Sequence, residues 1–199
     1  HAGITLDDRT AVKVLEQVKE REHHGYHYEA ADGSLELLIR KATGDYVPLF
    51  VLESWRVIVE KRADDRVATE ATVKLWAPPG PDAVRYVRTA EGNGPVNALD
   101  AALRAALVDI YPELGDIELV NFKVRILDET KGTGAVTRVL LDASDGDLVW
   151  GSIGVSENVI ESSWEALVDS LEYGMHVRTA AGTARAAAAA DPAPPSPGS

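Results

Sequence analysis

Apolar residues recur along this chain at two spacings, and the change of spacing divides it into helical and strand-forming parts. In residues 6–22 and 29–43 they return every three or four positions, as on one face of an α-helix. From Pro48 onward, short runs rich in Val, Leu, Trp, Tyr and Thr alternate with loops that contain Asp, Pro and Gly. The pattern predicts a helical start followed by antiparallel strands.

The two expected helices have recognisable ends. Thr5 followed by Asp8 is typical of a helix start, where a hydroxyl caps the first turn and an acid follows three residues later. Gly25 and Gly44 come directly after the two apolar stripes, where glycine commonly ends a helix. A unit of about 45 residues can hardly bury a core of its own, so we expect it to pack on the rest of the chain.

Beyond residue 48 the pattern predicts three strands and a helix, and then repeats that order. The expected strands are 49–61, 67–76, 83–90, 117–127, 135–142 and 148–156, and the expected helices are 95–110 and 158–173. Pro95 suits the first turn of a helix, where its missing N–H group is not needed.

The two βββα units also resemble each other in sequence. The pairs that align are Asn97 with Asn158, Asp100 with Glu161, Leu103 with Trp164, Thr72 with Thr137, and residues 54–57 with residues 121–124. Chance similarity between amphipathic elements is the alternative, but order, spacing and residue class agree, which favours an internal duplication. We therefore expect an α+β fold, a pseudo-symmetric (βββα)2 domain whose helices pack against antiparallel sheets.

These patterns divide the chain into three parts. Residues 1–47 form the helical linker subdomain, residues 48–175 form the (βββα)2 domain, and residues 176–199 form a tail rich in Ala and Pro. The tail has almost no large apolar side chain, so burial cannot offset the entropy lost on ordering it. We expect the tail to be disordered.

Composition narrows the classes of function. The net charge of −12 disfavours binding to nucleic acid or to an anionic membrane surface, because both are themselves negative. The chain has no cysteine, which excludes disulfides, thiolate metal sites and a cysteine nucleophile, and which fits a reducing compartment. No stretch approaches the about 20 apolar residues that a membrane-spanning helix needs.

Motifs for catalysis are missing from the sequence. There is no nucleophile elbow, no phosphate-binding loop and no zinc-protease motif. The histidine cluster is His23, His24 and His27. A metal site is one interpretation, but adjacent helical residues point apart, and a helix C-terminus that favours positive charge explains the cluster better.

The turn Gly92–Gly94 lies between an expected strand and an expected helix. One interpretation is a tight turn that leads into the helix, and the residues alone favour it. The other is a cradle of backbone N–H groups for a small carboxylate, because helix N-termini attract anions.

The same residues carry a resemblance to a known family. GNGPVNALDAAL (Gly92–Leu103) and ELVNFKVRIL (Glu118–Leu127), with the segment that continues to Gly174, resemble the C-terminal regulatory domain of the 2-isopropylmalate synthase family. Residues 25–44 and LESWRVIVEKR (Leu52–Arg62) resemble the linker and first regulatory strand of its citramalate synthase branch, which is the closer match. The resemblance extends from about Leu6 to Met175.

The resemblance implies regulation rather than catalysis. Full-length members begin with a TIM barrel that binds a divalent metal and condenses acetyl-CoA with a 2-oxo acid, which is pyruvate in the citramalate synthases, on a route to isoleucine. The motifs of that barrel are not in this sequence, so we expect no cofactor here and a catalytic barrel elsewhere in a longer, cytoplasmic protein. The family's regulatory domain forms a homodimer and binds the end-product amino acid as a feedback inhibitor.

The family's effector site lies near the dimer interface, at the turns before the repeated helices and on the adjoining strands. By resemblance, the positions expected to bind the effector are Gly92, Gly94, Val96, Asn97, Leu119, Phe122, Ile126, Thr133, Val136, Val155 and Glu157. Some relatives have tyrosine at the position of Phe122, so that hydroxyl contact is missing here. Taken singly, each apolar member is equally well explained as ordinary core.

An amino-acid effector suits these positions chemically. N–H groups at Gly94–Asn97 favour its carboxylate by about 0.3–1 kcal/mol, and the apolar positions favour its side chain. Glu157 or a backbone carbonyl is the expected acceptor for its ammonium group. Because one methylene is worth only about 1–3 kcal/mol, isoleucine follows from the citramalate synthase resemblance and not from the pocket.

Three other functions stay open. In these alternatives the chain is the leucine-binding regulatory domain of a 2-isopropylmalate synthase, a dimerisation module without effector binding, or an enzyme that carries out the condensation itself. The missing barrel makes the last of these the weakest.

Overall fold

The computed structural model describes residues 7–127 and 134–190, with side chains described as far as Thr179. Two helices come first, α1 (Asp8–His23) and α2 (Asp32–Thr43), joined by the 3-10 turn η1 (Tyr28–Ala30). The remaining elements are β1 (Val51–Lys61), β2 (Val67–Ala77), β3 (Val84–Gly92), α3 (Pro95–Leu107), the 3-10 turn η2 (Pro112–Asp116), β4 (Glu118–Ile126), β5 (Thr137–Ser144), β6 (Val149–Ser156) and α4 (Val159–Ala190). The predicted α+β fold with two βββα units is confirmed.

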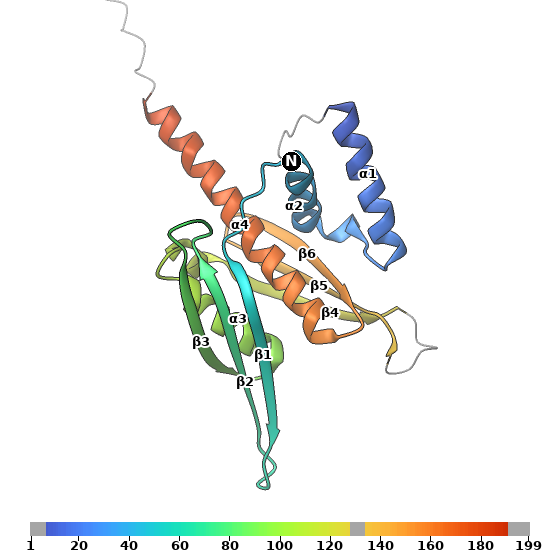
Figure 1. The fold of residues 1–199 in the computed structure, drawn as a ribbon, viewed down its shortest axis with the longest axis vertical. Helices are drawn as coiled ribbons and strands as arrows, with labels where there is room; N and C mark the ends of the chain where they lie inside the picture. The colour runs from blue at the N-terminus through green and yellow to red at the C-terminus, as the bar shows by residue number, and fades with distance from the viewer. Residues whose placement is uncertain (1–6, 128–133, 191–199) are drawn as a thin grey trace, which may run out of the picture.

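Each unit forms its own three-stranded antiparallel sheet, in the order β1–β2–β3 and β4–β5–β6. Helix α3 packs across β2 and β3, and α4 packs across β5 and β6 (Figure 1). Residues along β5 alternate between buried and half-buried, because successive side chains of a strand point to opposite faces and one face meets the helix. The first strand of each unit, β1 or β4, lies at the edge of its sheet.

A shared irregularity shows how the two sheets correspond. The register of β1 shifts between Leu52 and Ser54, and that of β4 shifts between Leu119 and Asn121. The bulges lie at equivalent positions, so the predicted match of residues 54–57 with 121–124 is confirmed. On the next strand the match is different, because Thr137, which pairs with Ile126, corresponds to Thr69 and not to Thr72.

The two helices also correspond differently from the sequence alignment. The first backbone hydrogen bond runs from Ala98 N to Gly94 O in α3 and from Ser162 N to Asn158 O in α4. Gly94 is therefore the counterpart of Asn158, and Asp100 is the counterpart of Trp164. The aligned pairs Asn97–Asn158, Asp100–Glu161 and Leu103–Trp164 are wrong by nearly one helical turn, a shift that leaves an amphipathic pattern almost unchanged.

Burial supports the corrected match of the helices. The buried positions of the first helix are Ala98, Leu99, Ala102, Leu103, Ala106 and Leu107. Their counterparts Ser162, Ser163, Ala166, Leu167, Ser170 and Leu171 are all buried as well.

The helical linker covers the free edge of β6. Asp32 Oδ1 accepts a hydrogen bond from Gly151 N at 2.8 Å, and Ser34 Oγ accepts one from Ile153 N at 3.0 Å. Glu165 of α4 accepts a third, from Val155 N at 3.1 Å. Alternate N–H groups of an edge strand point away from the sheet and need partners, so these side chains take the place of a neighbouring strand.

The last helix differs from the expected disordered tail that begins at residue 176. Helix α4 runs on to Ala190. Val177 packs against the core, and Arg178 pairs with Asp116 at 2.6 Å. Contacts from distant parts of the chain therefore hold the helix beyond residue 175, and the following alanines, which are strong helix formers, continue it. Residues 191–199 lie outside the described part.

Candidate functional site

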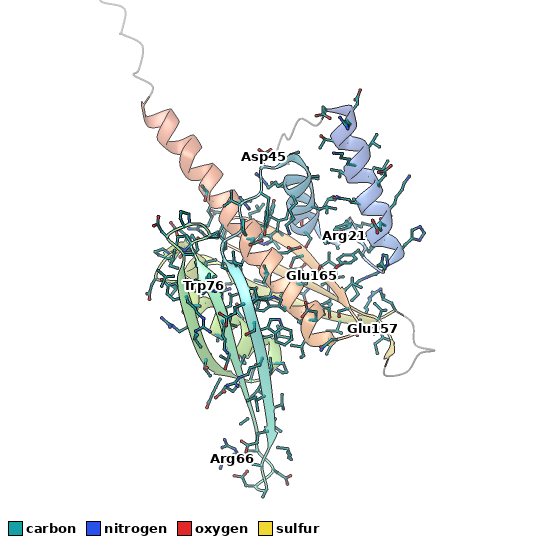
Figure 2. The ribbon with its side chains drawn as sticks, viewed as in Figure 1. Arg21, Asp45, Arg66, Trp76, Glu157 and Glu165 are labelled. Atoms are coloured by element: carbon teal, nitrogen blue, oxygen red, sulfur yellow. The ribbon has the colours of Figure 1, made fainter. Side chains whose placement is uncertain are left out.

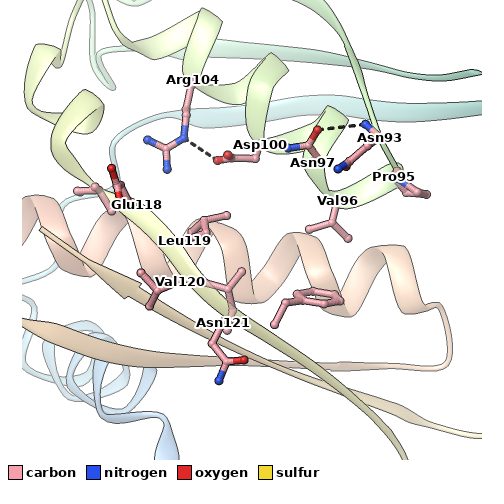
Figure 3. Close-up of a pocket in the computed structure, with 14 residues that line it drawn as sticks. Asn93, Pro95, Val96, Asn97, Asp100, Arg104, Glu118, Leu119, Val120 and Asn121 are labelled. Carbon is pink, nitrogen blue, oxygen red and sulfur yellow. Dashed lines mark hydrogen bonds and ion pairs between the residues drawn. The ribbon is translucent and has the colours of Figure 1, made fainter.

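A cavity of about 740 Å³ lies between the N-terminal half of α3 and the first half of β4 (Figure 3). Its volume is typical of a pocket for a small molecule. It is lined by residues 93–97, Asp100, Arg104, residues 117–122 and Leu141. The fold thus brings the glycine-containing turn of the first unit against a strand of the second.

The turn and the first residues of α3 line one side of this cavity. Gly94 is the N-cap of α3 and has no side chain that caps the helix, and Pro95 follows it at the first helical position. The N–H groups of Val96 and Asn97 belong to the first turn of α3, where backbone N–H groups have no hydrogen-bond partners within the helix. They make this end of α3 electropositive and suited to an anion.

The two glycines of the turn have different surroundings. A Cβ atom on Gly92 would lie 2.5 Å from Ala98 N, whereas one on Gly94 would have no atom within 4 Å. Gly92 therefore allows the strand to approach the helix, and Gly94 leaves open space at the cavity. The Asn97 side chain closes the turn, since its Oδ1 accepts a hydrogen bond from Asn93 N at 3.2 Å.

Apolar side chains from three elements also line the cavity. Val96 comes from α3, Leu119 and Phe122 come from β4, and Leu141 comes from β5. Leu141 is fully buried, but Phe122 is 43% exposed. A ligand side chain placed here would bury part of Phe122, which favours binding by the hydrophobic effect.

A carboxylate also lines the cavity. Asp100 Oδ1 accepts a hydrogen bond from Arg104 Nε at 2.7 Å (Figure 3). Arg104 in turn donates a hydrogen bond to Leu114 O. The Asp100 side chain is only 17% exposed. Burial raises the pKa of Asp100, and the positive charge of Arg104 opposes that rise. The pair places a half-buried negative group one helical turn from the N–H groups of the α3 N-terminus.

Sequence reasoning did not select Asp100 and Arg104 for the site. Asn97, Asp100 and Arg104 are spaced so that they share one face of a helix. That spacing was a usable signal, but it does not tell which neighbour the polar face meets.

The structure gathers five of the predicted positions at the cavity: Gly94, Val96, Asn97, Leu119 and Phe122. Gly92 lies behind them against Ala98. Ile126 is on the same face of β4 as Phe122 but about 13 Å further along the strand. Thr133 lies outside the described residues.

The remaining predicted positions lie elsewhere. Val136 accepts a hydrogen bond through its carbonyl from Leu127 N, at the far end of the β4–β5 hairpin. Val155 packs with Tyr28 and Ile153 under the linker, on the sheet face opposite Phe122. Glu157 is exposed at the start of α4 (Figure 2). Strand alternation explains why Val155 points away from α4, because its neighbour Gly154 lies on the sheet face that meets α4.

Helix α4 contacts the linker through a polar cluster. The Tyr26 hydroxyl donates to Glu165 Oε1 at 2.5 Å, and Arg21 lies 3.9 Å from the same oxygen and 5.0 Å from the Tyr26 ring (Figure 2). Burial, with the hydrogen bond to Glu165, raises the pKa of Tyr26. These contacts fix the Gly25–Tyr28 segment against the second unit.

The three histidines of the linker do not converge. His24 Nδ1 lies 2.8 Å from Glu20 O, and His27 Nε2 lies 2.9 Å from a Glu29 oxygen. In the described part of the chain, no three side chains of the metal-binding types come together.

The family to which this chain belongs follows from its similarity to a known domain. A model of the LeuA allosteric (dimerisation) domain matches residues 29–175. The chain belongs to the LeuA allosteric (dimerisation) domain family. The matched residues include both βββα units and α2, so the LeuA domain here contains the whole cavity. Among the described residues, no helix is long and apolar enough to cross a membrane.

Several curated relatives of this LeuA domain are (R)-citramalate synthases. Identity is 56% over 176 residues with the protein of Streptomyces coelicolor, 46% over 174 residues with that of Aquifex aeolicus, and 42% over 170 residues with that of Geobacter sulfurreducens. The matches cover 87%, 86% and 85% of this chain but only 32%, 32% and 31% of the relatives. The chain therefore spans about a third of the length of these enzymes.

Proposed function

We propose that this chain is the allosteric regulatory and dimerisation part of a citramalate synthase, and that it binds isoleucine as a feedback inhibitor in the cavity between α3 and β4. The parent protein would condense acetyl-CoA with pyruvate in a metal-dependent barrel outside this chain. The observation that carries the proposal is that one cavity offers an uncapped helix N-terminus, an apolar wall and a half-buried carboxylate.

These three features match the three parts of an amino acid. The ligand carboxylate meets the N–H groups of Val96 and Asn97, where helix-terminal anions gain about 0.3–1 kcal/mol or more. The aliphatic side chain packs on Leu119 and Phe122. The ammonium group meets Asp100, whose position inside the cavity makes it a better acceptor than the distant Glu157.

Isothermal titration calorimetry of the chain with isoleucine, leucine and valine tests this function. We expect heat with isoleucine, weaker binding of valine, which lacks one methylene, and loss of binding in Asp100→Asn if that carboxylate holds the ammonium group. Absence of heat with all three at millimolar ligand would sink the proposal and leave a dimerisation module.

Leucine is the second candidate ligand. The cavity is large enough for either isomer, and LeuA domains also occur in 2-isopropylmalate synthases by the resemblance described above. Tighter binding of leucine than of isoleucine in the same titration would assign the chain to that branch.

A further inference from the structure

Two βββα units in one chain would offer two equivalent cavities if their symmetry were complete. The first cavity lies between α3 and β4, so its counterpart lies between α4 and β1. The bulged strands and the helix starts identify the corresponding residues. The corresponding residues at the second junction are Phe50 for Ile117, Trp55 for Phe122, Trp164 for Asp100 and Asn158 for Gly94.

In the second unit a tryptophan fills the space that is open in the first. Trp164, the counterpart of Asp100, is only 6% exposed. Its ring centre lies 6.2 Å from that of Phe50 in an edge-on arrangement and 6.3 Å from that of Trp55. Both partners belong to the β1 side, so the indole occupies the junction between α4 and β1. At the same place in the first unit, the smaller Asp100 leaves the cavity open.

The start of α4 is closed as well. Asn158 Oδ1 lies 2.9 Å from Ile160 N and 3.4 Å from Glu161 N, so it caps the N–H groups of the first turn. Gly94, its counterpart, provides no such cap to α3. A ligand carboxylate could therefore replace water at α3, whereas at α4 it would have to displace a side chain of the protein itself.

We infer that Trp164 and Asn158 close a second, symmetry-related site, so that each chain binds one amino acid and not two. The part of this inference that concerns the amino acid rests on the proposed function. The tryptophan pocket itself does not, because it is defined by Phe50, Trp55 and Trp164 alone. Removing the indole opens an apolar, aromatic-lined pocket that accepts a flat aromatic molecule such as indole.

Calorimetry tests the number of sites and the exchange of residues between units. We expect one isoleucine per chain in the unaltered protein. Asp100→Trp places in the first unit the tryptophan that fills the second. The variant should keep the native circular dichroism spectrum, and its affinity for isoleucine should fall at least tenfold. The matched control is Ala105→Trp, which adds the same side chain to an exposed position of α3 and should bind normally.

The tryptophan pocket is tested with indole as the probe. In Trp164→Ala, saturating indole should raise the melting temperature by about 3 °C or more, as expected for a ligand that binds the folded state. The unaltered protein and Trp76→Ala, which removes an exposed tryptophan, should not respond. Trp164→Leu serves in the same assay if the alanine variant does not fold.

The outcomes separate this inference from the proposed function. No amino-acid binding by the unaltered protein defeats the proposed function, while the indole response still decides the pocket. Two bound isoleucines per chain would overturn the inference and leave the function intact. Full isoleucine affinity in Asp100→Trp would do the same, and so would loss of its fold while Ala105→Trp still folds. So would failure of both Trp164 variants to respond to indole.

Discussion

At the scale of single residues, the turn before α3 contains two glycines that are required for different reasons. Gly92 sits where any Cβ would collide with the backbone of Ala98, 2.5 Å away. Gly94 has extended backbone angles that any residue adopts, and free space around it. The first glycine serves packing, and the second leaves the helix end uncapped, which is what the proposed amino-acid site requires.

Exchanging each glycine for serine distinguishes these roles. Gly92→Ser should destabilise the chain by about 1–3 kcal/mol, because the added atoms overpack the strand against the helix. Gly94→Ser should leave stability equal or higher, since serine is a favourable N-cap, yet weaken isoleucine binding because its hydroxyl competes for the N–H groups. Urea denaturation and calorimetry on both variants measure this, and equal losses of stability would contradict it.

At the scale of elements, the edge of β6 shows how the linker becomes part of the sheet. A strand edge left unpaired is a site for aggregation. Here side chains of α2 and α4 accept the hydrogen bonds that a further strand would accept. The linker is therefore held by specific contacts to the second unit and not only by apolar packing.

Ser34→Ala tests this contact. Ser34 is buried, and removing its hydroxyl leaves Ile153 N without a partner, which should cost about 1–3 kcal/mol. Amide exchange of Ile153 should become faster. Thr43→Ala, on the same helix, is the control, because the Thr43 hydroxyl donates its hydrogen bond to Arg40 O within its own helix. Equal exchange rates at Ile153 in both variants would show that the serine does not protect the edge.

At the scale of the whole molecule, the first strand of the second unit presents an apolar strip. Phe122, Val124 and Ile126 are 43%, 44% and 58% exposed. Their partners on β5 include Leu141 and Val139, which α4 buries, so the strip lies on the helix-facing side where α4 does not reach. We expect a second copy of this dimerisation domain to cover it, which would place the cavity between α3 and β4 beside the dimer contact.

Adjacent residues of β4 provide a matched test of that contact. Val124→Asp places a charge within the strip and should weaken the homodimer at least tenfold, because the charge would be desolvated on association. Lys123→Asp introduces the same side chain on the opposite face of the strand and should leave the dimer intact. Sedimentation equilibrium measures both. A dimer of undiminished affinity in Val124→Asp would exclude the strip as the contact.

Much of the fold could be predicted from local pattern. The expected strand 67–76 is observed as Val67–Ala77, and the helix that begins at Pro95 is observed from that residue. The cavity-facing turn and Phe122 were also expected, through the family resemblance. Asp100 was missed because helical spacing reveals a polar face but not the strand opposite it. Val155 was placed with the cavity although its side chain points to the other face of the sheet.

The sequence by itself determined the elements, their order and the existence of a repeat, because the periodicity of apolar residues in strands and helices is a property of local residue spacing. Only the tertiary structure decided how the repeats correspond, since moving a helix by nearly one turn preserves its apolar stripe while changing every contact. That shift pairs Asp100 with Trp164. It thereby shows why one unit holds an open cavity and the other a packed aromatic cluster, a difference that depends on contacts between residues far apart in the chain.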